Sequence, residues 1–415
     1  WSADSTLHFV SDRTGYWNLY QWDGTAAVPL APMNADCGRP QWQFGGATYG
    51  FLDRQRIALT ACHDGFWRLH VIDTTTGDVR ELDLPYTSLG PFVAAGGGCV
   101  VVVAGGPRHP GAFVRVDVDS GATATLSHEG DQRIDDAVLS VPEQLTFPGH
   151  AGETAHAWYY RPHNDTVEGA PDFKPPLLVH AHGGPTGATS TTLSAGVQYW
   201  TSRGFAYLDV DYGGSTGYGR AYRRRLDRQS GVVDVGDCVE GARFLAKRGD
   251  VDPERLFIDG GSAGGYIVLC AMTFHDVFTA GVSLYGIADV PALFVGTHKF
   301  EARYEHIYPA DPDEQYARSP LHFVDRVRRP LLLLQGLDDP IVLPSQSQSM
   351  YDALRARGLP VAYVTFAGEG HGFRRAENIE RALDAETYFV CRVSGIEPPD
   401  DIEPIAIDNL AAQAG

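Results

Sequence analysis

The sequence predicts two structural parts: an all-β repeat region over residues 1–139, and an α/β domain with a doubly wound, mainly parallel sheet over residues 140–395. Three observations predict this division. Similar pairs of strand-like runs recur in the first part, strands and helices alternate in the second, and 415 residues provide more than one core. We expect residues 396–415, which are acidic and contain proline, to form a flexible tail.

The repeats of the first part each combine a hydrophobic strand, a polar turn and a second strand. They start near residues 7, 57 and 100, a spacing within the range of β-propeller blades. An ordinary β-sandwich is the alternative. Closed propellers usually need roughly 4–8 blades, so three visible repeats predict that the chain is the C-terminal portion of a longer protein. The missing blades would then be removed, disordered or carried on a separate chain.

The second part begins with two strand-like runs and continues with alternating strands and helices. The run Pro330–Gln335 is continuously apolar, as expected for a parallel strand that is covered on both faces. Further strands are expected near residues 143–147, 154–160, 177, 205, 255, 279 and 361, and helices near residues 233–247, 263–274, 344–357 and 376–392.

Composition excludes several classes of partner. The formal net charge of −19 disfavours binding to nucleic acid and to anionic membranes. No hydrophobic run is long enough to span a bilayer. The six cysteines are scattered without C-x-x-C spacing, which favours free thiols in a reducing compartment, so we expect a cytoplasmic protein. Assembly into a homo-oligomer stays open.

A glycine-rich motif, Gly260–Gly265, carries the strongest chemical signal. It places Ser262 between glycines, after a strand-like run and before an apolar, helix-like run. This context predicts a nucleophile elbow, a turn that lifts a serine hydroxyl out of the backbone. Gly213–Gly217 has the same spacing around Ser215, but the segment that follows it is polar and cationic. A helix packed on a sheet does not begin that way, so Ser215 is interpreted as a turn residue.

A serine nucleophile needs a base and a carboxylate that orients the base. In chains with this elbow the acid and then the histidine follow the serine. Asp338 and Asp339 follow the apolar strand and are both candidates for the acid, although turn formation before a proline also explains them. His371 is the only histidine beyond them, and it lies in a glycine-flanked loop after a strand-like run. An ordinary polar loop histidine is the alternative.

The negative charge that develops during acyl transfer needs hydrogen-bond donors. The motif predicts one donor in the backbone N–H of Ala263, directly after the nucleophile. The second should come from the loop Gly183–Pro185, which follows an earlier strand and whose glycines allow close approach of the backbone. His180 and His182 in that strand could be a metal pair, but no third ligand follows at a convincing spacing.

Four motifs in this order resemble the acylaminoacyl-peptidase-like branch of the prolyl oligopeptidase family of serine peptidases. They are His182–Pro185, Asp211–Arg220, Gly260–Gly265 and Gly368–Phe373. The resemblance is strong over residues 140–395 and loose over residues 1–139. It implies an α/β-hydrolase fold preceded by part of a β-propeller, and a chemistry that needs neither a metal nor an organic cofactor.

The resemblance also implies roles for individual residues. In the family the acid lies three residues after the glycine that ends its strand, and Gly336 plus three is Asp339. Ser262, Asp339 and His371 would therefore form a catalytic triad. The second glycine of the His-Gly-Gly-Pro motif, Gly184, would supply one N–H of the oxyanion hole beside that of Ala263.

Further implied roles concern the substrate. By resemblance, Tyr285 and Val342 line the pocket for the residue before the scissile bond, although a core aromatic after a strand is an equally good interpretation of Tyr285. Glu301 and Arg303 could contact a peptide terminus or form a surface salt bridge.

The resulting expectation is an enzyme that hydrolyses amide bonds of short peptides through an acyl-enzyme. The family implies activity of the oligopeptidase, aminopeptidase or acylaminoacyl-peptidase type, with a short peptide as the partner. An esterase or amidase acting on non-peptide or peptidyl-antibiotic substrates is one alternative. A catalytically inactive β-propeller binding protein is an alternative of another class.

Overall fold

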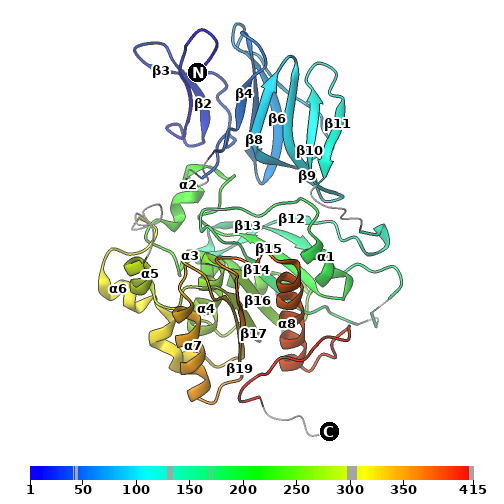
Figure 1. Cartoon of the computed structure of the whole chain (residues 1–415), viewed down its shortest axis with the longest axis vertical. Coiled ribbons are helices and arrows are strands. Elements are labelled where there is room, and N and C mark those ends of the chain that lie inside the picture. Colours follow the sequence, from blue (N-terminus) through cyan, green and yellow to red (C-terminus); the bar gives the residue numbers. More distant parts are fainter. Residues whose placement is uncertain are drawn as a thin grey trace. The chain divides into compact units, whose positions relative to one another are not determined.

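The computed structural model describes residues 1–40, 42, 45–128, 134–167, 169–170, 172–296 and 306–410 (Figure 1). The chain divides into two compact units. The first consists of residues 1–142, 186–195 and 215–224, and the second of residues 143–185, 196–214 and 225–415.

The described residues of the first unit form three antiparallel sheets (Figure 1). In each sheet the strands lie side by side in chain order, as in a meander. Every predicted pair of strands is present, and outer strands extend each pair. The sheets contain β1 (His8–Ser11), β2 (Asn18–Trp22) and β3 (Ala27–Pro29); β4 (Tyr49–Phe51), β5 (Arg56–His63), β6 (Phe66–Asp73) and β7 (Val79–Glu81); and β8 (Ser88–Gly96), β9 (Cys99–Gly106), β10 (His109–Asp117) and β11 (Thr123–His128).

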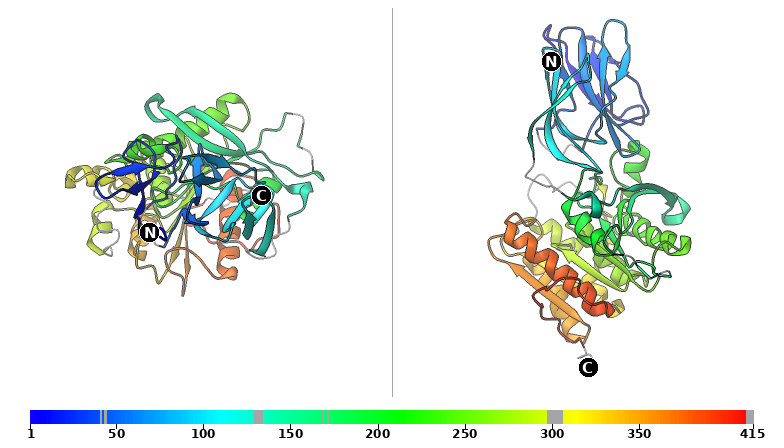
Figure 2. Two further views of the ribbon diagram at one scale, coloured as in Figure 1. Left: turned by 90° about the horizontal axis from the view of Figure 1, so that it is seen from above. Right: turned by 90° about the vertical axis from the view of Figure 1, so that its right-hand side faces the viewer.

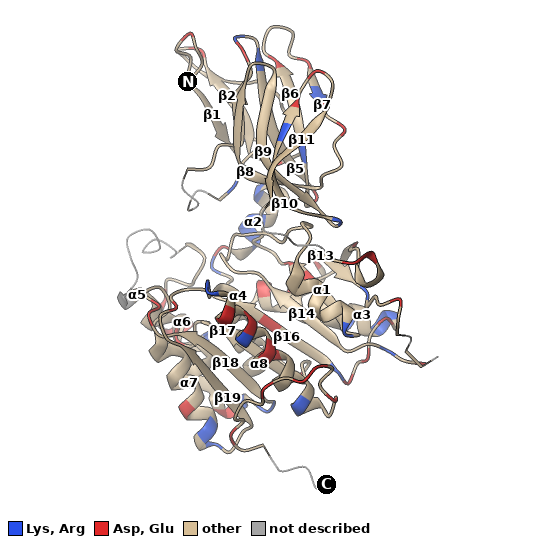
Figure 3. Ribbon diagram, turned by 45° about the vertical axis from the view of Figure 1, so that its right-hand side comes forward, with Lys and Arg blue, Asp and Glu red and all other residues tan. Residues whose placement is uncertain are grey.

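Two short segments, 186–195 and 215–224, join the first unit because polar contacts tie them to its strands and loops. The buried carboxylate of Asp36 accepts hydrogen bonds from the backbone N–H groups of Gly217, at 3.2 Å, and Gly219, at 3.0 Å. Arg223, at the end of the basic helix α2 (Gly219–Arg223; blue in Figure 3), lies 3.5 Å from the same carboxylate. These contacts explain why the Gly-Gly-Ser-Thr-Gly segment does not continue into a sheet-covering helix.

The described residues of the second unit form an eight-stranded sheet in the order β12-β13-β15-β14-β16-β17-β18-β19. The six strands from β15 to β19 in that order are parallel, and β13 and β12 add an antiparallel edge. The mainly parallel sheet predicted from the sequence is therefore present. Its strands are β12 (Glu143–Pro148), β13 (Thr154–Tyr160), β14 (Leu177–Ala181), β15 (Ala206–Asp211), β16 (Leu256–Gly261), β17 (Ala280–Leu284), β18 (Leu331–Gly336) and β19 (Val361–Phe366).

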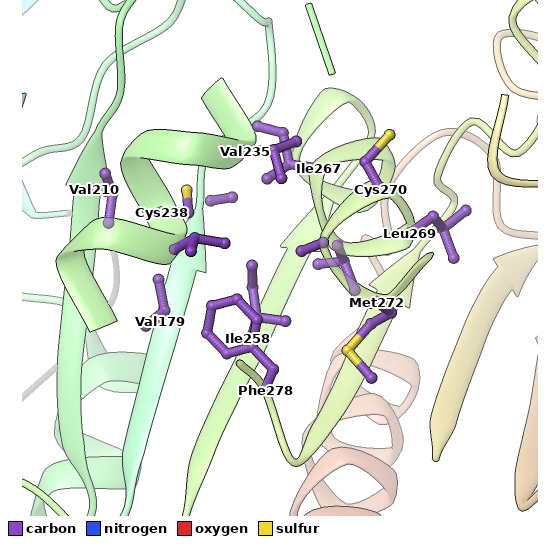
Figure 4. Close-up of a cluster of buried hydrophobic side chains, with 14 of the residues drawn as sticks. Val179, Val210, Val235, Cys238, Ile258, Ile267, Leu269, Cys270, Met272 and Phe278 are labelled. Atoms are coloured by element: carbon purple, nitrogen blue, oxygen red, sulfur yellow. The ribbon is translucent and has the colours of Figure 1, made fainter. Parts of the chain in front are cut away.

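Helices cover both faces of this sheet. On one face, Val179 and Ile258 of the sheet pack with Val235, Cys238 and Ile267 from two helices (Figure 4). On the other face, α8 (Ala376–Ser394; red-orange in Figure 2) lies along the sheet. The helices are α1 (Ala195–Ser202), α3 (Val233–Arg248), α4 (Ala263–Phe274), α5 (Val290–Gly296), α6 (Pro312–Ala317), α7 (Pro344–Ala356) and α8 (Ala376–Ser394), with short 3₁₀ turns at η1 (Asp136–Val138), η2 (His150–Gly152), η3 (Arg224–Leu226) and η5 (Pro320–Arg326).

The face under α8 carries a row of ionisable side chains where a parallel sheet is normally apolar. His180 of β14 is paired in register with Asp209 of β15 and Asp259 of β16, and its Nδ1 lies 3.0 Å from a carboxylate oxygen of Asp259. Burial opposes the charge of His180, but the carboxylate of Asp259 outweighs this effect and raises the pKa of His180 to about 9. Burial raises the pKa of Asp209 to about 7 and that of Glu386 in α8 well above its usual range.

The segment that follows α8 is described up to residue 410. The backbone of Asp408 exchanges two hydrogen bonds with Val361 of β19, at 2.8 and 3.1 Å. This part of the acidic C-terminal segment therefore pairs with the outermost parallel strand of the sheet.

All six cysteines are free thiols, and all except Cys99 are buried. Across the described ranges, none of the helices combines the length and the apolar composition that crossing a bilayer requires.

Candidate active site

Ser262 lies at a sharp turn between β16 and α4, where its backbone has φ 59° and ψ −119°. A positive φ is uncommon for a residue with a side chain, and it marks a position that the surrounding structure holds firmly. The N–H of Ser262 donates to the carbonyl oxygen of Leu284 at 3.0 Å. A Cβ on Gly264 would lie 1.9 Å from the carbonyl oxygen of Ala181, and one on Gly260 would lie 2.7 Å from the same oxygen. The glycines are therefore required by close packing against the end of β14.

The structure brings together the three side chains that the sequence singled out. The Nε2 of His371 lies 2.7 Å from the Oγ of Ser262. On the other side of the ring, Nδ1 lies 2.8 Å from Oδ2 of Asp339. This is the linear arrangement in which an imidazole can accept a hydroxyl proton on one nitrogen while the other nitrogen donates to a carboxylate.

Asp339 is held in place by several donors. Its Oδ1 accepts the backbone N–H groups of Ile341, at 2.8 Å, and Val342, at 3.0 Å, and its Oδ2 also accepts the side-chain amide of Gln335 at 3.3 Å. The side chain of Asp339 is fully buried, whereas Asp338 is exposed. Of the two candidate acids, only Asp339 contacts the histidine.

The loop that carries His371 is anchored by Glu369, which the sequence analysis missed. Its carboxylate accepts hydrogen bonds from the backbone N–H groups of Arg374 and Arg375 and from the side-chain amide of Asn378, at 2.8–3.1 Å. The hydrogen bonds from Asn378 and Arg375 lower the pKa of Glu369. The available signal was a carboxylate two residues before the histidine in a loop rich in glycine.

Tyr285 packs against the imidazole. Its ring meets that of His371 edge to face, with centroids 4.9 Å apart and planes inclined by 63°. The backbone of Tyr285 also has a positive φ, 40°, and its N–H donates to the carbonyl oxygen of Leu334 at 2.7 Å. Val342 lies in the hydrophobic core, with 2% of its surface exposed, behind Asp339. The pocket role of both residues stays a prediction.

The loop expected to supply an oxyanion donor lies beside the nucleophile. A Cβ on Gly183 would lie 3.1 Å from the carbonyl oxygen of Gly261 and 3.5 Å from the Cβ of Ser262. Gly184 has φ 128°, a conformation that side chains rarely adopt, and Ala263 is the first residue of α4. Backbone N–H groups at a helix start and in such a loop favour a nearby negative charge.

The two histidines considered as a metal pair have other partners. His180 contacts Asp259, and His182 stacks on Tyr212 with ring centroids 4.2 Å apart. Burial lowers the pKa of His182 to about 4, so its ring is neutral at physiological pH. Among the side chains that the structure describes, no group of three or more His, Cys, Asp or Glu residues has the arrangement of a metal site.

Ser215, at the centre of the second Gly-x-Ser-x-Gly motif, is completely buried. Its neighbours Gly217 and Gly219 donate to Asp36, so this motif anchors a segment of the first unit. The other candidates, Glu301 and Arg303, lie outside the described residues.

Comparison with known proteins gives the family. Residues 191–397 match the prolyl oligopeptidase family. This segment of the chain belongs to that family. Among its relatives, the dipeptidyl aminopeptidase BIII of Pseudoxanthomonas mexicana is 32% identical over 230 residues, which are 53% of this chain and 33% of that protein. The acylamino-acid-releasing enzyme of Arabidopsis thaliana is 28% identical over 227 residues, 52% of this chain and 30% of that protein.

Solved structures of prolyl oligopeptidase relatives extend the similarity to almost the whole chain. A puromycin-hydrolyzing peptidase of Mycobacterium tuberculosis is 42% identical with a TM-score of 0.95, over 98% of this chain and 63% of that one. A puromycin hydrolase is 38% identical with a TM-score of 0.94, over 98% and 62%. The chain thus spans about a third of the length of these two curated relatives and about three fifths of these structures.

Proposed function

We propose that the chain is a serine peptidase that hydrolyses amide bonds of short peptides through an acyl-enzyme. The observation that carries this proposal is the unbroken series of contacts from Ser262 through His371 to Asp339, at 2.7 and 2.8 Å. Membership of the prolyl oligopeptidase family supports the choice of an amide as the bond that is cleaved.

In the first half of the reaction, the Oγ of Ser262 attacks the carbonyl carbon while its proton passes to Nε2 of His371. The Nδ1–H of His371 donates to Asp339, which keeps the ring in the required tautomer and stabilises the imidazolium. The N–H groups of Gly184 and Ala263 donate to the carbonyl oxygen as it becomes negative. His371 then gives its proton to the leaving amine, and the acyl group remains on Ser262.

In the second half, water replaces the amine. His371 takes a proton from the water, whose oxygen attacks the ester carbonyl of the acyl-enzyme. The bond to Oγ of Ser262 then breaks, His371 returns the proton to that oxygen, and the carboxylic acid is released. Every proton passes through His371, so the reaction consumes only the amide and one water.

An amidase that cleaves puromycin or related aminoacyl compounds is a second candidate. It is favoured by the 42% identity and the TM-score of 0.95 to a puromycin-hydrolyzing peptidase. Both candidates use the same chemistry and differ in what the substrate carries on either side of the bond. A catalytically inactive binding protein is not supported, because the three side chains lie at distances suited to catalysis.

The test combines labelling with substrate comparison. A fluorophosphonate probe should label the chain at Ser262, and the Ser262→Ala variant should neither react nor turn over any substrate. Dipeptide anilides, N-acetylated dipeptide anilides, puromycin and esters of matched size should then be compared by kcat/KM. Preference for peptide anilides supports the peptidase, and preference for puromycin supports the amidase. Labelling that persists at full extent in Ser262→Ala would contradict both.

We further propose that the three antiparallel sheets of the first unit are blades of a β-propeller. The meander order of the strands within each sheet supports this assignment. We expect the propeller to limit the length of the peptides that the enzyme cleaves. A peptide ladder of increasing length should show kcat/KM falling sharply beyond a limiting size.

A further inference from the structure

The first unit contains a cavity of about 410 Å³ that the proposed chemistry of Ser262 does not use. Its wall is largely aromatic and apolar, and includes Trp17, Tyr49 and Phe92 together with two prolines. Among the described residues that line it, Arg39 is the cationic side chain. The volume lies within the range of cavities that bind small molecules.

Arg39 is held at the wall with part of its hydrogen-bonding capacity unused. Its guanidinium lies over the ring of Trp67, with the central carbon 3.8 Å from the ring centroid, and its Nη2 donates to the carbonyl oxygen of Leu89. The Nε is buried, and within the described ranges it has no hydrogen-bond partner. A buried donor without a partner is costly, and it belongs to the side chain that supplies positive charge to the wall of the cavity.

Arg39 also carries a charge that the face of Trp67 contacts but that no carboxylate among the described residues neutralises. Burial lowers the pKa of Arg39 to about 10, so the side chain is still cationic at neutral pH. Other arginines of this unit contact carboxylates: Arg56 lies 2.8 Å from Asp53, and Arg223 lies 2.9 Å from Asp12. No described carboxylate makes such a contact with Arg39. A cation that is largely withdrawn from water is normally paired with a carboxylate, because desolvating an isolated charge is costly.

We propose that this cavity binds a carboxylate attached to an apolar or aromatic group, such as the free C-terminus of a short peptide or an acylated amino acid. One guanidinium balances one carboxylate, whereas a phosphate dianion would leave a negative charge uncompensated in a chain of net charge −19. The rings of Trp17, Tyr49 and Phe92 provide the apolar surface for the rest of the ligand. This site requires no chemistry at Ser262 and goes beyond the proposed peptidase function.

Two probes of nearly equal size and shape, one anionic and one neutral, test the proposal: N-acetylphenylalanine and its primary amide. Isothermal titration calorimetry on the 415-residue chain should show the acid binding at least about tenfold more tightly than the amide. In Arg39→Gln this preference should disappear. Equal binding of the two probes to the unaltered chain, absence of saturable binding, or a preference that survives in Arg39→Gln would overturn the proposal.

Arg68→Gln is the matched control. Arg68 also lies near an aromatic ring, 5.4 Å from the centroid of Phe66, but it has Glu81 at 3.6 Å and does not line the cavity. This variant should keep the full preference for the acid. Phe92→Ala provides a second readout, because Phe92 is 51% exposed and its removal spares the core. It should weaken both probes severalfold and retain the preference. Unchanged affinity of both probes in Phe92→Ala would contradict the proposal even if Arg39→Gln failed to fold.

Discussion

The Nε2 of His371 lies 2.7 Å from the Oγ of Ser262, although 109 residues separate them in the chain. The contact arises because β16 and β19 belong to one parallel sheet, and the turns that follow them meet at the same edge. The elbow holds the serine and Asp339 holds the histidine.

Asp339 and Asp338 should behave very differently. Asp339→Asn keeps the shape but replaces the carboxylate that accepts the Nδ1–H of His371, so kcat/KM should fall by about 10⁴-fold. Asp338→Asn is the matched control: its side chain is exposed, and kcat/KM should stay within about twofold. Steady-state kinetics on an anilide substrate measures both. An equal loss in the two variants would remove Asp339 from the proposed triad.

Ser215→Ala should affect stability and leave labelling intact. Ser215 is completely buried, so loss of its hydroxyl should cost about 1 kcal/mol of unfolding free energy. Chemical denaturation measures this cost, and labelling by the fluorophosphonate should proceed as in the unaltered chain. If Ser215→Ala abolished labelling, the nucleophile would have been assigned to the wrong motif.

Tyr285 should act on the imidazole through its ring. Tyr285→Phe keeps the edge-to-face contact with His371, so kcat/KM should change by less than about threefold. Tyr285→Ala removes the contact, and kcat should fall by about tenfold, because such aromatic pairs contribute about 0.5–1.5 kcal/mol. The pH profile of kcat/KM separates positioning from folding, since a looser imidazole should shift the profile of the alanine variant. An unshifted profile in a folded Tyr285→Ala would leave only a structural role.

Glu369→Gln should loosen the loop of His371. The hydrogen bonds from Asn378 and Arg375 lower the pKa of Glu369, so their contribution to stability is present above the ordinary pKa of a glutamate and is lost as the pH falls through the lowered value. Misplacing the histidine should reduce kcat/KM by about tenfold or more at neutral pH. Glu377→Gln, at the start of α8, is a suitable control. No difference between the two variants would show that the anchor is dispensable.

The ionisable row under α8 should make stability depend on pH. The pKa of His180 is raised to about 9 beside Asp259, so its contribution is complete below its unfolded value, near 6.5, and is lost as the pH rises through about 9. The pKa of Asp209 is raised to about 7, so the folded state favours its protonated form. Stability from this group is therefore also lost as the pH rises, over a lower pH range than for His180. The thermal unfolding temperature should therefore decrease as the pH rises from about 6 to about 10. His180→Gln should make this decrease shallower in the upper part of the pH range. An identical profile in the variant would contradict this assignment.

The sequence predicted the parts of the fold that depend on local patterns. The apolar run 330–335 corresponds to β18, and the four predicted helices correspond to α3, α4, α7 and α8. These elements were predictable because the spacing of hydrophobic residues shows which faces of a strand or helix are buried. The short helices α1, α5 and α6 were not predicted, since they lack a long apolar stripe.

In the site, the order of motifs was enough to select Ser262 and His371, which the structure brings together. The supporting residues could not be predicted in the same way. Gln335 and Glu369 act through hydrogen bonds that form only when separate loops return to the end of the sheet. The contact of Asp36 with the backbone N–H groups of Gly217 and Gly219 could not be predicted either, because Asp36 and Gly217 lie 181 residues apart in the sequence.

The strand order has a consequence for how the molecule loses activity. β16, which leads into Ser262, has strands on both sides, whereas β19, which leads into the loop of His371, lies at the edge and is bordered there by Asp408. Edges open more readily than centres. As the denaturant concentration rises, the loop of His371 should lose its position while Ser262 keeps its own. Activity should therefore be lost before most of the sheet unfolds.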